Sequence, residues 1–235
     1  MIRDGSKDRD LRDRLLAVDL LRELKNKYTY KELSRLLGLQ ESLLCRYVNG
    51  STVPSEQQAR DLISKVGQKG FLHRFFQDKI RKFPDSFIDT SELLHYPSML
   101  KILLETHVSR FEDVEKIVGI ASNGIPFATI VATILDKPLI IVKKHKDSIH
   151  LTYVEESVRE SDSVVVSIYA RKDFISKSDR VLIVDDVMRS GKTLLSTSKL
   201  VRKAGGRVAG ALIIVAKREN INSINEFPME VVFDL

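Results

Sequence analysis

Hydrophobic residues recur every three or four positions through the first third of the chain, which is the spacing of amphipathic helices. This spacing predicts a first helix over residues 8–25. The patterns over residues 29–32 (Thr-Tyr-Lys-Glu) and 55–58 (Ser-Glu-Gln-Gln) are typical of capping boxes and predict the starts of two further helices. Gly67 and Gly70 then interrupt the helical pattern, which indicates a linker.

Beyond about residue 100 the pattern changes to short runs rich in Val and Ile that alternate with helical stretches. Such alternation predicts an α/β domain built on a parallel sheet. The predicted strands are 116–120, 138–142, 164–168, 181–184 and 207–215, and two predicted helices are 126–135 and 193–204. We therefore expect a helical domain over residues 1–67, an intervening segment over 68–98 and an α/β domain over 99–235.

The amino-acid composition excludes some classes of protein. With 235 residues, 43% of them hydrophobic and 30% charged, the chain has enough apolar material for two cores, which excludes a disordered chain. A single cysteine, Cys45, cannot form an internal disulfide, and no run approaches the roughly 20 apolar residues of a membrane span. These features predict a cytoplasmic protein. Residues 1–70 hold 14 Lys and Arg against 10 Asp and Glu, so the basic excess is concentrated where a polyanion would bind.

Residues 30–50 have the spacing of a helix-turn-helix, with the small Ser34 where two helices cross and Gly38 at the turn. Together with Pro54 and the helix after it, this segment resembles the lambda-repressor-like helix-turn-helix domains. The resemblance implies double-stranded DNA as a partner of the second helix of this motif, predicted over about residues 40–48. The same pattern also suits a small helical bundle that acts as a cap or a dimerisation element. The expected DNA-binding residues are Gln40, Glu41, Ser42, Cys45, Arg46, Tyr47 and Asn49.

The strongest chemical signal lies in residues 181–193 (VLIVDDVMRSGKT), where a buried strand ends in Asp185 and Asp186 and a tight loop opens a helix. Adjacent carboxylates accept hydrogen bonds from neighbouring ribose hydroxyls, while loop amides, hydroxyls and a helix N-terminus bind phosphate. A Walker A loop would need glycine where Asp186 stands, and the glycine spacing elsewhere does not fit a dinucleotide fingerprint. The pattern therefore favours a sugar phosphate.

This segment resembles the type I phosphoribosyltransferases, whose signature is an apolar strand, two acidic residues and a Thr/Ser-Gly-x-Thr phosphate loop. Residues 118–126 are similar to the diphosphate-binding loop of that family, and residues 144–163 to its mobile loop. The resemblance covers residues 99–235, and residues 68–98 would form either a linker or a hood over the base. The implied architecture is a parallel-sheet type I phosphoribosyltransferase fold preceded by a small all-α helix-turn-helix domain.

The resemblance also implies a ligand, phosphoribosyl diphosphate or a nucleotide, with Mg²⁺ carried by the diphosphate. The implied ligand-binding residues are Asp185, Asp186, Val187, Met188, Arg189, Ser190, Gly191, Lys192, Thr193, Ser122, Asn123, Gly124, Lys143 and Lys144.

Two functions are open at this point, and Arg189 bears on the choice between them. In the hypoxanthine-guanine branch of the family the matching position carries a carboxylate that manages the proton of the base, which a guanidinium cannot do. Because some active members also lack that carboxylate, the position alone does not decide. With the helix-turn-helix resemblance, we favour a homodimeric transcription regulator of nucleotide metabolism that senses the ligand. The alternative is an active purine (or orotate) phosphoribosyltransferase with an accessory N-terminal helical domain.

Overall fold

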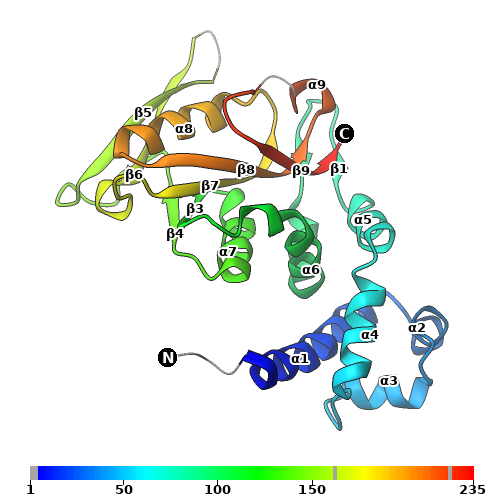
Figure 1. Cartoon of the computed structure of the whole chain (residues 1–235). Coiled ribbons are helices and arrows are strands. Elements are labelled where there is room, and N and C mark those ends of the chain that lie inside the picture. Colours follow the sequence, from blue (N-terminus) through cyan, green and yellow to red (C-terminus); the bar gives the residue numbers. More distant parts are fainter. Residues whose placement is uncertain (1–4, 161–162, 222–223) are drawn as a thin grey trace. The chain divides into compact units, whose positions relative to one another are not determined.

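A computed structural model describes residues 5–160, 163–221 and 224–235 of the chain, which divide into two compact units (Figure 1). Unit 1 comprises the chain up to Lys79 together with Glu92–Leu103, and unit 2 comprises Ile80–Ser91 and Leu104–Leu235. The segment 68–98, which the sequence leaves as a linker or hood, is therefore divided between the two units.

Unit 1 is helical, and its helices begin where the caps predict. Both capping boxes are confirmed. The hydroxyl oxygens of Thr29 and Ser55 accept from the backbone three residues on, and the backbone N–H groups of Thr29 and Ser55 donate to the side chains of Glu32 and Gln58. Gly38 closes the second helix in the left-handed conformation (φ 69°), as the turn requires. Gly70, in contrast, lies within a further helix and does not interrupt one. The helices are α1 (Gly5–Lys25), α2 (Tyr30–Leu37), α3 (Glu41–Val48), α4 (Glu56–Val66) and α5 (Lys69–Gln77), followed by the 3₁₀ turn η1 (Ser91–His95) and α6 (Pro97–Val108).

The core of unit 1 combines apolar contacts with one buried cation. Leu33 of α2 and Leu44 of α3 are fully buried, so the two short helices are held together by side-chain packing. Lys79 is 7% exposed, and its ammonium lies 2.8 Å from a carboxylate oxygen of Glu92 and 4.5 Å from the centre of the Tyr96 ring. The ion pair with Glu92 and the face of the Tyr96 ring thus compensate the hydration that the Lys79 ammonium loses on burial.

Unit 2 is built on a five-stranded sheet in the order β4-β3-β7-β8-β9, with every neighbouring pair parallel. Helices α7 and α8 cover opposite faces of this sheet (Figure 1). The fold class predicted from the alternation of strands and helices is therefore confirmed as an α/β domain with a parallel sheet. The elements are β3 (Lys116–Ile120), α7 (Gly124–Leu135), β4 (Leu139–Val142), β7 (Arg180–Met188), α8 (Lys192–Ala204), β8 (Arg207–Ala216) and β9 (Met229–Asp234).

Two antiparallel hairpins lie outside the five-stranded sheet, and one is joined to its edge after β4 by two backbone hydrogen bonds between Lys143 and Tyr169. One of them contains residues 164–168, so the prediction that this run belongs to the parallel sheet was wrong. Its Val and Ile residues signal burial but not the direction of the partner strand. Residues 161–162 of the expected mobile loop lie outside the described residues. The remaining elements are β1 (Arg81–Lys82), β2 (Ile88–Asp89), η2 (Ser109–Phe111), β5 (Tyr153–Arg159), β6 (Val165–Arg171), η3 (Lys172–Phe174) and α9 (Arg218–Ile221).

The parallel arrangement brings the carboxyl ends of all five strands to one edge of the sheet. In open parallel sheets this edge is where ligands bind. In the part of the chain that the structure describes, no helix has both the length and the apolar character needed to cross a lipid bilayer.

The packing of unit 1 is testable with two leucines of neighbouring helices. Leu44→Ala removes a fully buried side chain and should lower the free energy of unfolding by about 2–5 kcal/mol, because a cavity remains. The matched change Leu36→Ala, at a residue 44% exposed, should cost about 0.5 kcal/mol or less. Urea unfolding of both variants measures the difference. Equal losses of unfolding free energy in the two variants would contradict the burial of Leu44 in the core of unit 1.

Candidate functional site

Two carboxylates near the end of the central strand β7 form the centre of the site. Asp185 and Asp186 are both half-buried, and the backbone N–H of Asp186 donates to Oδ1 of Asp185 at 3.0 Å. The hydroxyl of Thr90, which follows β2, donates to Oδ2 of Asp186 at 3.4 Å. The acidic pair is thereby attached to the β1–β2 hairpin, a segment almost 100 residues earlier in the chain.

The start of helix α7 lies directly against the acidic pair. A Cβ atom on Gly124 would lie 2.8 Å from Oδ1 of Asp185 and 3.2 Å from its Cα, so only glycine fits without displacement. Asn123 precedes α7 as its N-cap, and the peptide bond between Ala121 and Ser122 is cis. The predicted loop residues Ser122, Asn123 and Gly124 are therefore next to the predicted carboxylates.

Burial raises the pKa of Asp185 well above its usual value, and the neighbouring charge of Asp186 raises it further. The hydrogen bond from the backbone of Asp186 acts in the opposite direction. The ionised pair is thus costly in the unliganded protein. Hydrogen-bond donors or a cation bound at this point would relieve that cost.

The loop after β7 encloses a cavity of about 370 Å³, here called the loop cavity. Gly191 adopts the left-handed conformation (φ 70°) that the turn into α8 requires, and the N-terminus of α8 follows at Lys192. Hydroxyls of Ser190 and Thr193 line the same cavity. Hydroxyl groups beside free backbone N–H groups at a helix start suit an anion such as phosphate. The lining residues are Val158, Glu160, Asp185, Val187, Met188, Arg189, Ser190, Gly191, Lys192, Thr193 and Leu194.

A second cavity of about 420 Å³, here called the lysine cavity, lies where β3 and β4 end. It is lined by Ala121, Ser122, Ile125, Lys143, Lys144 and His145. The ammonium of Lys143 is 2.8 Å from both carboxylate oxygens of Asp147, and that of Lys144 is 2.5 Å from Glu160. Both predicted lysines are therefore present at the cavity and hold carboxylates that an incoming polyanion would have to displace.

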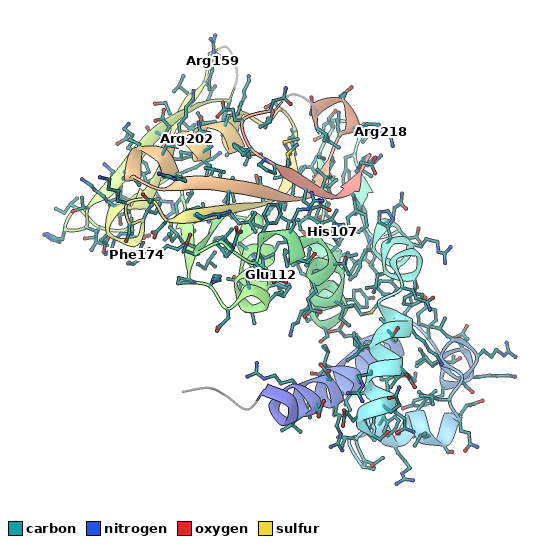
Figure 2. The ribbon with its side chains drawn as sticks, viewed as in Figure 1. His107, Glu112, Arg159, Phe174, Arg202 and Arg218 are labelled. Atoms are coloured by element: carbon teal, nitrogen blue, oxygen red, sulfur yellow. The ribbon has the colours of Figure 1, made fainter. Side chains whose placement is uncertain are left out.

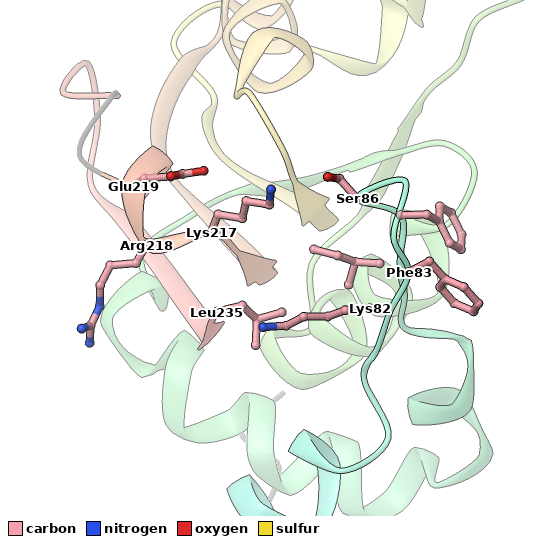
Figure 3. Close-up of a pocket in the computed structure, with 9 residues that line it drawn as sticks. Lys82, Phe83, Ser86, Lys217, Arg218, Glu219 and Leu235 are labelled. Atoms are coloured by element: carbon pink, nitrogen blue, oxygen red, sulfur yellow. The ribbon is translucent and has the colours of Figure 1, made fainter.

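A third cavity, here called the hairpin cavity, was not predicted from the sequence (Figure 3). It measures about 560 Å³ and combines the β1–β2 hairpin with the chain after β8. Figure 3 shows Lys217 and Ser86 extending toward each other from opposite walls. The two walls of this cavity are about 130 residues apart in the sequence, so no local sequence pattern reveals the cavity. The lining residues are Lys82, Phe83, Ser86, Phe87, Ile88, Lys217, Arg218, Glu219 and Leu235.

The residues predicted to contact DNA lie on and around α3 of unit 1. Gln40, Glu41, Ser42, Arg46 and Asn49 are exposed, and Cys45 is half-buried, with its sulfur 3.3 Å from the Asn49 amide nitrogen. Tyr47 is only 2% exposed, and its hydroxyl donates to Gln58 at 3.0 Å. The prediction that Tyr47 contacts an outside partner was therefore wrong, because its side chain belongs to the core.

The raised pKa of Asp185 yields a test through stability. A carboxyl whose pKa is higher in the folded than in the unfolded state makes the free energy of unfolding fall as pH rises between those two values. Asp185→Asn removes this cost and keeps the acceptor for Asp186, so at pH 7 it should stabilise the protein by about 1–3 kcal/mol. The advantage should shrink as pH falls, because the wild-type carboxyl takes up its proton at a higher pH in the folded than in the unfolded state.

Thermal unfolding between pH 4 and pH 8 provides the measurement. Asp61→Asn is the control, since Asp61 is exposed within α4 and its Oδ1 also accepts a hydrogen bond, from Gln57. If Asp185→Asn is less stable than wild type at pH 7, ionised Asp185 does not destabilise the folded protein, and the prediction is wrong.

The close approach of α7 is tested at Gly124. Gly124→Ala should lower the free energy of unfolding by about 1–3 kcal/mol, since the added methyl group meets the backbone and carboxylate of Asp185. The control Gly70→Ala, inside helix α5 with no atom closer than 3.9 Å, should be neutral or stabilising. Chemical denaturation distinguishes the two, and a neutral Gly124→Ala would refute the contact.

The chain matches the phosphoribosyl transferase domain family over residues 89–232. Among curated relatives, the adenine phosphoribosyltransferase of Actinobacillus pleuropneumoniae serotype 5b (strain L20) is 30% identical over 147 residues, which cover 59% of this chain and 81% of the relative. That of Serratia proteamaculans (strain 568) is 33% identical over 150 residues, with 60% and 75% covered.

Solved structures agree with this match. The adenine phosphoribosyltransferase from Rhodothermus marinus DSM 4252 superposes with a TM-score of 0.64 at 28% identity, covering 71% of this chain and 99% of that one. The enzyme from Saccharomyces cerevisiae, at 16% identity and a TM-score of 0.63, covers 70% and 99% and shows the shared fold.

These relatives correct the function favoured from the sequence. They are named as enzymes, so the prediction of a DNA-binding transcription regulator with double-stranded DNA as its partner was wrong. The favoured reading depended on the N-terminal helices, which lie outside residues 89–232, whereas the alternative depended on the motifs inside the match. On the matched residues and the arrangement of the site, the chain belongs to the phosphoribosyl transferase domain family.

Proposed function

We propose that this protein is an active phosphoribosyltransferase that moves the phosphoribosyl group of phosphoribosyl diphosphate onto a purine base, with adenine as its acceptor. The observation that carries the proposal is the continuous run from Asp185 and Asp186 through the Gly191 turn to the N-terminus of α8, at the carboxyl edge of a parallel sheet. The names of the relatives support adenine.

The donor's sugar phosphate fits the acidic pair and the loop cavity. Asp185 and Asp186 accept hydrogen bonds from neighbouring ribose hydroxyls, which also relieves their mutual repulsion. Ser190, Thr193 and the free backbone N–H groups at the start of α8 bind the 5′-phosphate. The guanidinium of Arg189 adds a positive charge at the rim of this cavity.

The diphosphate fits the lysine cavity, where Ser122, Lys143 and Lys144 are gathered. Mg²⁺ prefers oxygen ligands and commonly takes one or two carboxylates together with substrate phosphates and water. The donor set suits it, since Asp185 and Asp186 supply carboxylate oxygens next to this cavity, and these two residues would hold the ion with the substrate. When bound, Mg²⁺ neutralises part of the charge on the diphosphate.

The base fits the hairpin cavity, whose walls include the rings of Phe83 and Phe87 and the side chain of Ile88. Flat apolar walls accept a planar heterocycle, and Lys217 and Glu219 offer polar contacts at its edge. In the transfer, a ring nitrogen of the base forms a bond to C1 of the ribose as the bond from C1 to the diphosphate oxygen breaks. The bonding electrons leave with the diphosphate, and the base releases its proton to water.

Arg189 stands where the hypoxanthine-guanine branch carries a proton-accepting carboxylate, and it cannot serve as that base. Positioning the two substrates and stabilising the departing diphosphate are therefore the main contributions of this site.

For the N-terminal helices we propose an accessory role in assembly or autoregulation of the enzyme. Support comes from their packing, since the left-handed Gly38 lies between α2 and α3 and both helices carry buried leucines.

The proposed activity predicts release of diphosphate when the protein is given Mg²⁺, phosphoribosyl diphosphate and adenine. The variant Asp185→Asn with Asp186→Asn should lower turnover by at least about 100-fold, because both ribose contacts lose their charge. Asp136→Asn, exposed on unit 2, should retain wild-type turnover. Hypoxanthine, guanine and orotate complete the panel, and the absence of diphosphate release with every base would overturn the proposal.

A further inference from the structure

Arg189 lies between the loop cavity and the hairpin cavity. It lines the loop cavity, and the central carbon of its guanidinium is 5.5 Å from the centre of the Phe87 ring. Phe87 lines the hairpin cavity and comes from a hairpin about 100 residues earlier in the chain. A guanidinium within about 6 Å of an aromatic centre makes a favourable cation–π contact. One side chain therefore connects the wall of one cavity to the wall of the other.

The backbone of Arg189 makes a second connection to the hairpin cavity. Its carbonyl oxygen accepts a hydrogen bond from the side-chain amide of Asn220 in α9. The same short helix contains Arg218 and Glu219, which line the hairpin cavity. The position of Arg189 is thus tied to both walls of that cavity, the hairpin through its side chain and α9 through its main chain.

The geometry of a guanidinium allows it to bind an anion and an aromatic ring together. Its N–H groups lie in one plane and reach a phosphate through the edge, while its flat face is free to stack on a ring. An anion in the loop cavity would therefore fix Arg189 in place without removing it from Phe87.

We propose that Arg189 is a positioning residue that couples occupancy of the loop cavity by a sugar phosphate to binding of the base in the hairpin cavity. This inference rests on the proposed function. A 5′-phosphate orders Arg189, the ordered guanidinium holds the Phe87 ring, and the ring completes the wall against which the base packs. Phe87 is 40% exposed in the unliganded protein, so its ring has conformational freedom to lose.

Coupling of this kind is reciprocal, so the base must raise affinity for the sugar phosphate by the same factor. The contact that transmits it is an exposed cation–π pair, for which about 0.5–1 kcal/mol is usual. That range corresponds to a two- to fivefold change in a dissociation constant, roughly.

The experiment measures adenine binding to the full-length protein by calorimetry, with and without saturating ribose 5-phosphate. This sugar phosphate has no diphosphate to lose, so no transfer interferes. The ratio of the two dissociation constants is the coupling factor, expected at about two to five for wild type. Arg189→Gln removes the cation, Phe87→Leu removes the ring but keeps an apolar wall, and each should bring the factor to about one.

The double variant should show no further change, because both substitutions remove the same contact. Arg171→Gln is the matched control, since the guanidinium of Arg171 lies 4.6 Å from the centre of the Phe174 ring but neither residue lines any of the three cavities. Figure 2 shows Phe174 at the opposite end of unit 2 from Arg218, which lines the hairpin cavity. This control should keep the wild-type factor.

A purely structural role for Arg189 would weaken the binding of each ligand alone and leave the coupling factor unchanged, which would overturn the proposal. A wild-type factor of one, with both ligands bound, would overturn the coupling while leaving the enzymatic function intact. Failure of the wild-type protein to bind either ligand would instead overturn the proposed function together with this inference.

Discussion

The carboxylates of Asp185 and Asp186 are held next to each other in partly buried surroundings, and the segments around them are arranged to tolerate that charge. Gly124 allows the positive end of helix α7 to approach Asp185, and the hydroxyl of Thr90 donates to Asp186. A residual cost remains, visible in the raised pKa of Asp185. Bound hydroxyls or a cation would offset this cost, because both favour the ionised carboxylates.

Local signals in the sequence were sufficient for the parts of the fold and site that depend on neighbouring residues. The strand over residues 116–120, the two capping boxes, the left-handed Gly38 and the start of α8 after Gly191 follow from short-range chemistry. The hairpin cavity could not be predicted from such local signals, since its walls come from segments that are distant in sequence and meet only in the folded protein. Residues 164–168 show a related failure, because burial determines composition whereas strand direction depends on the connection.

The error over function has a physical basis as well. A helix-turn-helix pattern specifies how two helices pack, through Leu33, Gly38 and Leu44, and the structure shows that packing. Packing residues carry no information about a partner, which depends on the exposed side chains. The acidic pair and its loop differ in this respect, since Asp185 lines the same cavity as Ser190, Thr193 and the start of α8, a combination suited to a sugar phosphate. Evidence from a site therefore outweighs evidence from a helical pattern.

The three cavities of the site are built mostly from different segments of the chain. The loop and lysine cavities consist mostly of segments that follow β3, β4 and β7. The hairpin cavity uses the β1–β2 hairpin and the chain after β8, so the cavity proposed for the base is built from other segments than the two proposed for the donor. Arg189 lines the loop cavity yet contacts Phe87, which lines the hairpin cavity. On the proposed function, a substitution of Arg189 therefore acts on the binding of both substrates.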